Sequence, residues 1–113
     1  MKTHQMGLQA KYYDYIKDGT KRIELRLFDE KRRQIEPGDI IEFSKDKNER
    51  FEVNVVGLLR YDTFQHLFED FDISVLADKS MTKDELLSVL GEFYPIEKQN
   101  ALGVVGIRVE IKK

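Results

Sequence analysis

The hydrophobic pattern of the chain changes its period several times, and each change marks a predicted element. Tyr12 and Ile16 lie four residues apart within 10–18, which predicts a short helix that ends at Gly19. Over 23–27 the apolar residues instead alternate with charged ones, which is the two-residue period of a half-buried strand. Further strands are predicted at 3–8, 40–43, 51–61 and 103–111.

Helices in the second half of the chain are predicted from their start signals. Thr63 is suited to cap a helix that begins at Phe64. Thr82 and Glu85 have the spacing of a capping box ahead of a second apolar helical pattern. Pro95 favours the start of a last helical turn. We therefore expect two or three helices between the fourth and fifth strands.

The order of these elements indicates the fold class. The charged run 29–33 is predicted as a loop or short turn, 36–39 as a turn, and 45–50 as a polar hairpin tip. Grouped antiparallel strands with segregated helices are typical of the α+β class. Because the strands are few and the helices short, we expect a small β-barrel flanked by the helices. No Gly/Ser-rich linker or repeat interrupts the chain, so residues 1–113 are predicted to form one domain.

Composition excludes several kinds of chemistry. The chain has no cysteine and two histidines, which excludes disulfides, thiolate zinc sites and three-histidine centres. His66 and Asp70 have helical spacing, but two ligands make a poor metal site, so we expect no metal and no cofactor. No segment approaches the roughly 20 apolar residues of a membrane helix. Residues 1–20 contain no signal-peptide core, so no membrane association and a cytoplasmic location are expected.

The charge is distributed unevenly along the 113 residues. The formal net charge is −2, which argues against broad affinity for duplex nucleic acid. Residues 61–97 carry nine acidic side chains against Lys79 and Lys83, a net charge of −7, whereas both flanking segments are mildly basic. A polarised surface is therefore expected. The acidic segment could serve as a docking site for a protein partner.

The clearest candidate for chemistry lies on the strand at 23–27. Arg22, Glu24 and Arg26 share one face through the two-residue period. A carboxylate between guanidinium groups is held ionised, and the excess of cations could bind a phosphate through paired N–H donors. The same pattern is also typical of a solvated strand face with cross-paired charges.

These residues belong to a longer motif that resembles a known family. The motif reads Gly19-x-Lys21-x-x-Glu24-x-Arg26, then Ile35-x-x-Gly38-Asp39-x-Ile41-x-Phe43, and it resembles the ASCH domain, a branch of the PUA-like superfamily. The resemblance extends to His4 and Met6 near the start of the chain and to 103–107 near its end. It implies a PUA-like β-barrel with a cleft that takes RNA or a nucleotide-like ligand. Lys21, Glu24 and Arg26 would line that cleft.

One branch of this family hydrolyses the amide of N4-acetylcytidine with a lysine, a threonine and a distal glutamate. Lys21 matches the lysine, but Glu24 stands at the threonine position and no glutamate stands at 78–80. The hydroxyl nucleophile therefore does not carry over. A hydrolase here would use Glu24 as a general base, with Lys21 or Arg26 stabilising an oxyanion. The neighbouring cations oppose this role, because they lower the carboxyl pKa.

Further contacts to the ligand are predicted around this motif. The candidates for phosphate contact are Arg22, Lys31, Arg32 and Arg33, for which a solvated basic loop is the alternative. Tyr61 and Tyr94 lie at element ends and could stack on an unpaired base, for which packing is the alternative. The sequence thus predicts a domain that binds RNA or a modified nucleotide. The alternatives are a hydrolase of a small amide or modified nucleoside and a protein-interaction module that uses 61–97.

Overall fold

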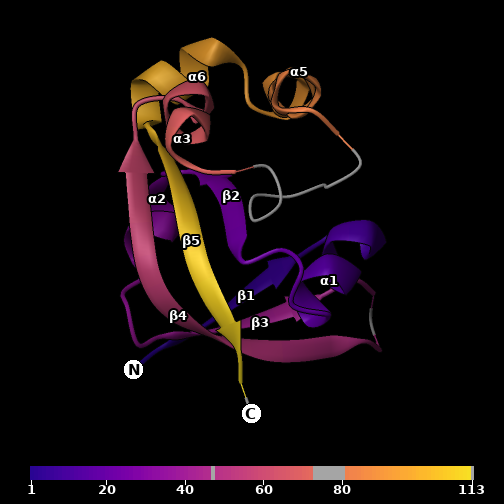
Figure 1. The fold of residues 1–113 in the computed structure, drawn as a ribbon. Helices are drawn as coiled ribbons and strands as arrows, with labels where there is room; N and C mark the ends of the chain where they lie inside the picture. Colours follow the sequence, from indigo (N-terminus) through magenta and orange to yellow (C-terminus); the bar gives the residue numbers. More distant parts are fainter. Residues whose placement is uncertain (47, 73–80, 113) are drawn as a thin grey trace.

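A single curled sheet forms the frame of the molecule. The computed structural model describes residues 1–46, 48–72 and 81–112. Within them the five strands follow the order β1-β3-β4-β5-β2. In chain order they are β1 (Thr3–Gly7), β2 (Ile23–Leu27), β3 (Ile40–Ser44), β4 (Arg50–Tyr61) and β5 (Val104–Ile111). Figure 1 shows the long β4 bending with the sheet, which makes a half-barrel flanked by short helices. The predicted α+β class and small PUA-like barrel are confirmed.

One pair of strands departs from the expected antiparallel grouping. β1 pairs with β3 in parallel, whereas the other three pairings are antiparallel. The chain between these two strands includes α1 (Ala10–Lys17) and β2, which lies at the opposite edge of the sheet. A parallel pair needs such a long crossover, and this connection supplies it. β1 and β2 consequently form the two edges of the curled sheet.

The helices begin where the start signals predict. The Thr63 hydroxyl accepts a hydrogen bond from the His66 amide at the start of α3 (Phe64–Asp70). Thr82 and Glu85 form a complete capping box on α5 (Lys83–Phe93), and Pro95 precedes α6 (Ile96–Leu102). None of the helices in the described ranges is long and apolar enough to cross a membrane.

The charged run at 29–33 forms a one-turn helix, α2 (Glu30–Arg33), where a loop or short turn is predicted. The Asp29 carboxylate accepts a hydrogen bond from the Arg32 amide at 3.0 Å, which is the N-cap interaction. The basic residues of α2 follow at its C-terminal end, where cations interact favourably with the helix dipole. Local capping therefore orders a segment that has no apolar pattern.

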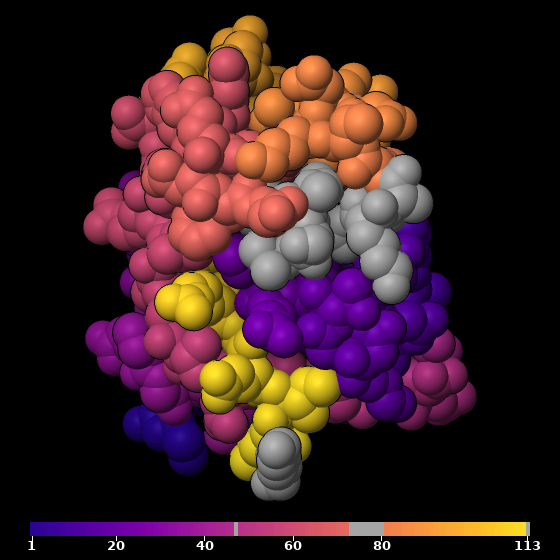
Figure 2. Space-filling view, viewed as in Figure 1, coloured from indigo at the N-terminus to yellow at the C-terminus, as the bar shows by residue number. Residues whose placement is uncertain are grey.

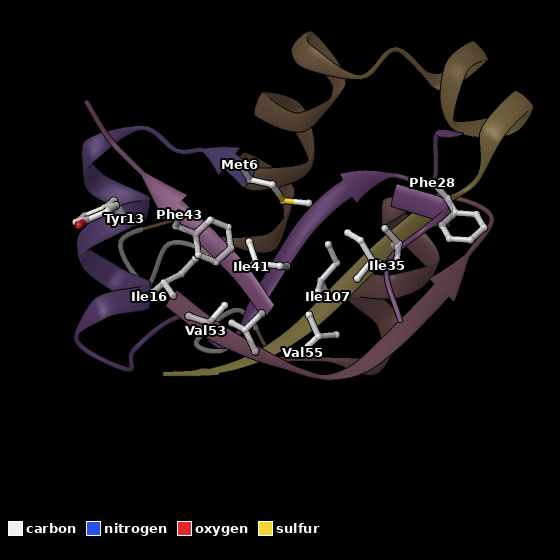
Figure 3. Close-up of a cluster of buried hydrophobic side chains, with 12 residues drawn as sticks. Met6, Tyr13, Ile16, Phe28, Ile35, Ile41, Phe43, Val53, Val55 and Ile107 are labelled. Atoms are coloured by element: carbon white, nitrogen blue, oxygen red, sulfur yellow. The ribbon is translucent and has the colours of Figure 1, made fainter. Parts of the chain in front are cut away.

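Two apolar cores lie on the two faces of the sheet. The inner core runs through the curl from Tyr13 to Phe28, which lie at opposite ends of the cluster in Figure 3. The outer core joins Ile23, Leu25 and Leu27 to the apolar faces of α3 and α5. Figure 2 shows that the helices leave part of β5 uncovered, in yellow, where its last residues are exposed.

β2 is buried on both faces, although the alternation predicts a half-buried strand. Its apolar face packs in the outer core, and Glu24 on the other face is also buried. This face lies at the seam between the two sheet edges, because Arg26 reaches from β2 to the Gly7 carbonyl of β1. The seam therefore encloses charged side chains that the sequence pattern places in solvent.

A second polar network fixes the start of the chain. The buried Asp39 carboxylate accepts hydrogen bonds from the Lys2 amide at 3.1 Å and the Glu36 amide at 3.0 Å, and it lies 2.9 Å from His4 Nε2. The hydrogen bond with His4 is the largest influence on the carboxyl pKa, and burial opposes it. Together with the backbone donors, it lowers the pKa of Asp39 to about 2.

Asp39 is expected to make the free energy of unfolding depend on pH in the acidic range. Its folded pKa of about 2 lies below the ordinary 3.8, so its contribution is complete above about pH 5 and is lost as the pH falls through 2. We expect Asp39→Asn to lower the free energy of unfolding by about 2 kcal/mol at pH 7. Urea unfolding of both proteins at pH 7, 4 and 2 should show the difference shrinking. A difference that is equal at all three pH values would contradict this account.

Candidate functional site

A pocket of about 180 Å³ lies between the end of β1, the start of α1, β2 and α5. Its polar residues include Lys21, Glu24 and Arg26, the three motif residues. Its apolar walls come from Leu8, Leu25, Leu86 and Leu90, and its aromatic residues are Tyr12, Phe93 and Tyr94. The structure therefore brings the motif to one concavity and adds an apolar and aromatic lining.

The Glu24 carboxylate is the centre of the polar group. Arg26 donates to Oε2 through Nε at 3.0 Å and Nη2 at 2.9 Å. Lys21 Nζ lies 3.2 Å from Oε1, and the Leu25 amide donates to the same oxygen at 3.2 Å. Glu24 is 5% exposed and Lys21 is 3% exposed. We name this buried group of Lys21, Glu24 and Arg26 the ion trio.

Burial and the neighbouring charges act in opposite directions on the trio. Burial alone would raise the pKa of Glu24, but the charges and hydrogen bonds of Lys21 and Arg26 outweigh it and lower that pKa. Burial lowers the pKa of Lys21, against the attraction of Glu24. Burial would also lower the pKa of Arg26, but Glu24 raises it. With all three groups ionised, the trio carries one net positive charge at the pocket.

Arg26 links the trio to both the sheet seam and the pocket. Its Nη2 also donates to the Gly7 carbonyl at 2.9 Å, which joins β2 to β1. Its Nη1 makes no hydrogen bond to any residue that the structure describes, and its side chain is 17% exposed. Arg26 therefore lines the pocket while Nε and Nη2 hold its side chain in place.

Other predicted contacts lie away from this pocket. Arg22 is exposed, and its Nε donates to the Gly19 carbonyl at 3.4 Å. The Tyr61 hydroxyl donates to Asp70 Oδ2 at 2.5 Å, and its ring lines a different hollow. The structure thus does not bring Arg22 or Tyr61 together with the ion trio.

The cations of α2 also lie apart from the pocket. Lys31 Nζ donates to the Gln5 carbonyl at 3.2 Å, on the edge of β1. Arg32 forms an ion pair with Asp29 at 3.2 Å. The guanidinium of Arg33 lies 4.7 Å from the centre of the Phe28 ring. A ligand role for these three residues stays a prediction.

Sequence reasoning missed most of the pocket lining. The helical pattern assigns Phe93 to the packing face of α5, but the side chain is 60% exposed and lines the pocket. Tyr94, a predicted stacking residue, also lines it. The available signal was the pair of aromatic residues directly before Pro95, at the end of a helix.

The arrangement is better suited to binding than to base catalysis. Four donors already occupy the Glu24 carboxylate, and its pKa is lowered, whereas a general base works best with a pKa near the operating pH. The position at 78–80, expected for a distal glutamate, lies outside the described residues. The described part of the chain contains no group of three or more His, Asp or Glu side chains that could hold a metal ion.

Comparisons with known proteins agree with this architecture. The chain is similar over 99% of its length to the crystal structure of hypothetical protein PH0355, with 41% sequence identity, a TM-score of 0.88 and 100% of that chain covered. It is also similar to the solution structure of protein PF0455 from Pyrococcus furiosus, with 36% identity, a TM-score of 0.80 and 98% of each chain covered. No curated protein has a detectable match.

The family assignment rests on the whole chain as well as on the motif. The sequence model of the ASCH domain family matches residues 6–113. These residues include every strand after the first and all of the pocket residues. The chain belongs to the ASCH domain family.

Proposed function

We propose that this protein binds single-stranded RNA or a modified nucleotide, with one base in the pocket beside the ion trio. The observation that carries the proposal is the buried trio at the polar end of a pocket with apolar and aromatic walls. Membership of the ASCH family is consistent with RNA binding. Unpaired bases are commonly held by stacking on aromatic side chains and by hydrogen bonds to their edges.

The size of the pocket favours a single base over a larger ligand. Pockets for drug-sized molecules usually measure about 300–1,000 Å³. At about 180 Å³, this one suits a fragment that continues outside it, such as one base of a strand or nucleotide. Arg26 Nη1 would donate to a carbonyl oxygen of the base, and Phe93 and Tyr94 would stack on or beside the ring. Glu24 would act through Lys21 and Arg26, which it orients.

Two features favour single strands over duplexes. A base inside a duplex cannot enter a pocket without leaving the stack, which costs a few kcal/mol. The net charge of −2 also supplies no general attraction for a duplex. Recognition would therefore depend on one inserted base and a few local cations.

Arg26→Gln is expected to weaken binding because it removes a charged donor from the pocket. Losing a charge-assisted hydrogen bond typically costs about 1.5–3 kcal/mol, so affinity for short single-stranded RNA should fall about ten- to hundredfold. Arg22→Gln is the matched control, since Arg22 is exposed and outside the pocket. Titration calorimetry measures both. Equal affinity of Arg26→Gln and wild type would overturn the assignment of Arg26.

Glu24→Gln is expected to destabilise the fold more than Lys21→Met. The glutamine removes the carboxylate charge with which both Lys21 and Arg26 pair, and breaking a buried ion pair in this way costs about 3–5 kcal/mol. Lys21→Met leaves a neutral Glu24–Arg26 pair. Urea unfolding of the three proteins tests the order. If Glu24→Gln is as stable as wild type, the trio is not the interaction that holds the seam.

The Phe93→Ala variant tests whether Phe93 stacks on a ligand base or only packs within the protein. The side chain is 60% exposed, so its removal should change stability little. If it stacks on a base, the loss should be about 1–3 kcal/mol of binding free energy. Ile96→Ala is the control, because Ile96 is 51% exposed, lies three residues away and does not line the pocket. Similar small effects of both variants on RNA affinity would exclude stacking on Phe93.

A further inference from the structure

The guanidinium groups of two arginines that are far apart in the sequence both lie close to one buried phenylalanine ring. The guanidinium carbon of Arg60, on β4, lies 4.2 Å from the centre of the Phe28 ring, and that of Arg33, on α2, lies 4.7 Å from it. The two charged groups are thus no more than about 9 Å apart, the sum of those distances. A guanidinium beside an aromatic ring is attracted to it and keeps N–H donors available for other partners.

These donors are not used within the described protein. Both side chains are exposed, and neither guanidinium makes a hydrogen bond or an ion pair with any residue in the described ranges. The neighbouring arginines differ, because Arg32 pairs with Asp29 and Arg26 pairs with Glu24. Two like charges that form no ion pair with a carboxylate of the described residues form a place where an anion is favoured.

The surroundings provide room for a ligand. Arg60 and Phe28 line an open hollow of about 680 Å³, together with Tyr61, Asp62, Asn100 and Gly103. Arg33 does not line this hollow itself, and it is related to it through the Phe28 ring, 4.7 Å from its guanidinium carbon. The Asn100 side chain is exposed there and can donate to an oxygen. Asp62 is the one carboxylate among the described residues of this hollow, and it would oppose an anion.

The strand register relates this hollow to the pocket. Arg60 pairs with Val105, and Val105 pairs with Arg26, so the three residues form one row across β4, β5 and β2. Neighbouring strands lie about 4.8 Å apart, which places the Cα atoms of Arg60 and Arg26 about 10 Å from each other. Val105 between them is buried, so a strand would pass around this row, and a strand of six nucleotides at about 3.4 Å each is longer than that separation.

We infer that Arg33 and Arg60 bind a backbone phosphate of the RNA strand whose base occupies the pocket. This inference rests on the proposed function, because it requires the ligand to be a strand. Phe28 is a positioning residue that both guanidinium groups lie beside. The pocket would then select a base, and the arginine pair would bind the backbone a few nucleotides away.

The test is the salt dependence of affinity for oligouridylates, measured by fluorescence anisotropy between 50 and 300 mM KCl. The double variant Arg33→Gln/Arg60→Gln should reduce the slope of log K against log salt by about 0.7 for a six-nucleotide strand, which is the value for one neutralised phosphate on a single strand. Its affinity for uridine alone should remain within twofold of wild type. Asp62→Asn should strengthen binding of the strand but not of uridine.

Two controls distinguish the possible failures. Arg50→Gln removes an exposed arginine from the opposite end of β4 and should leave the slope unchanged. Arg26→Gln should weaken both uridine and the strand. If Arg26→Gln weakens binding while the double variant keeps the wild-type slope, the assignment of the phosphate site is wrong and the assignment of the pocket is supported. If only the double variant changes binding, the phosphate site stands and the pocket assignment fails. If wild type binds neither probe, both are wrong.

Discussion

The Glu24 carboxylate is the interaction on which the seam and the pocket both depend. It is buried on β2 and holds Arg26 in the position from which Nη2 reaches the Gly7 carbonyl on the other edge of the sheet. It also compensates Lys21, whose burial is otherwise unfavourable. A buried cation without such a partner would cost several kcal/mol. One carboxylate thus allows two cations to remain under the helices and closes the gap between β1 and β2.

The same constraint determines what the pocket can do. Because Glu24 is already saturated by donors and its pKa is lowered, the trio presents cationic donors rather than a proton acceptor. Apolar side chains of α5 line the pocket that the trio also lines, and hydrogen bonds are stronger in surroundings of low polarity. The aromatic residues at the end of α5 add flat surfaces beside it. These features are the basis of the proposal that the pocket takes one base of a strand or nucleotide.

Local patterns in the sequence predicted the elements well, because caps and periodicity act over a few residues. The capping box at Thr82 and the alternation over 103–111 both correspond to observed elements. Features that depend on residues far apart in the chain, such as strand pairing and burial, could not be predicted in this way. Nothing near β1 indicates that it pairs in parallel with β3, since the pairing depends on a crossover. The motif identified the trio, but its charged residues suggested a solvated face, and only the three-dimensional structure shows that Lys21 and Glu24 are buried. Arg60 belongs to no sequence motif, and only its short distance to the Phe28 ring in the structure points to a role in binding.

The central claim is that a ligand base enters the pocket beside the ion trio, and side-chain NMR measures this most directly. In a protein labelled at arginine Nε and at leucine and valine methyl groups, short single-stranded RNA should shift the signals of Arg26, Val89 and Leu90, all of which line the pocket. The signals of Val53 and Val55 in the inner core, and of exposed Arg22, should stay in place. Saturable shifts confined to residues outside the pocket, with Arg26 and Leu90 unchanged, would contradict the account.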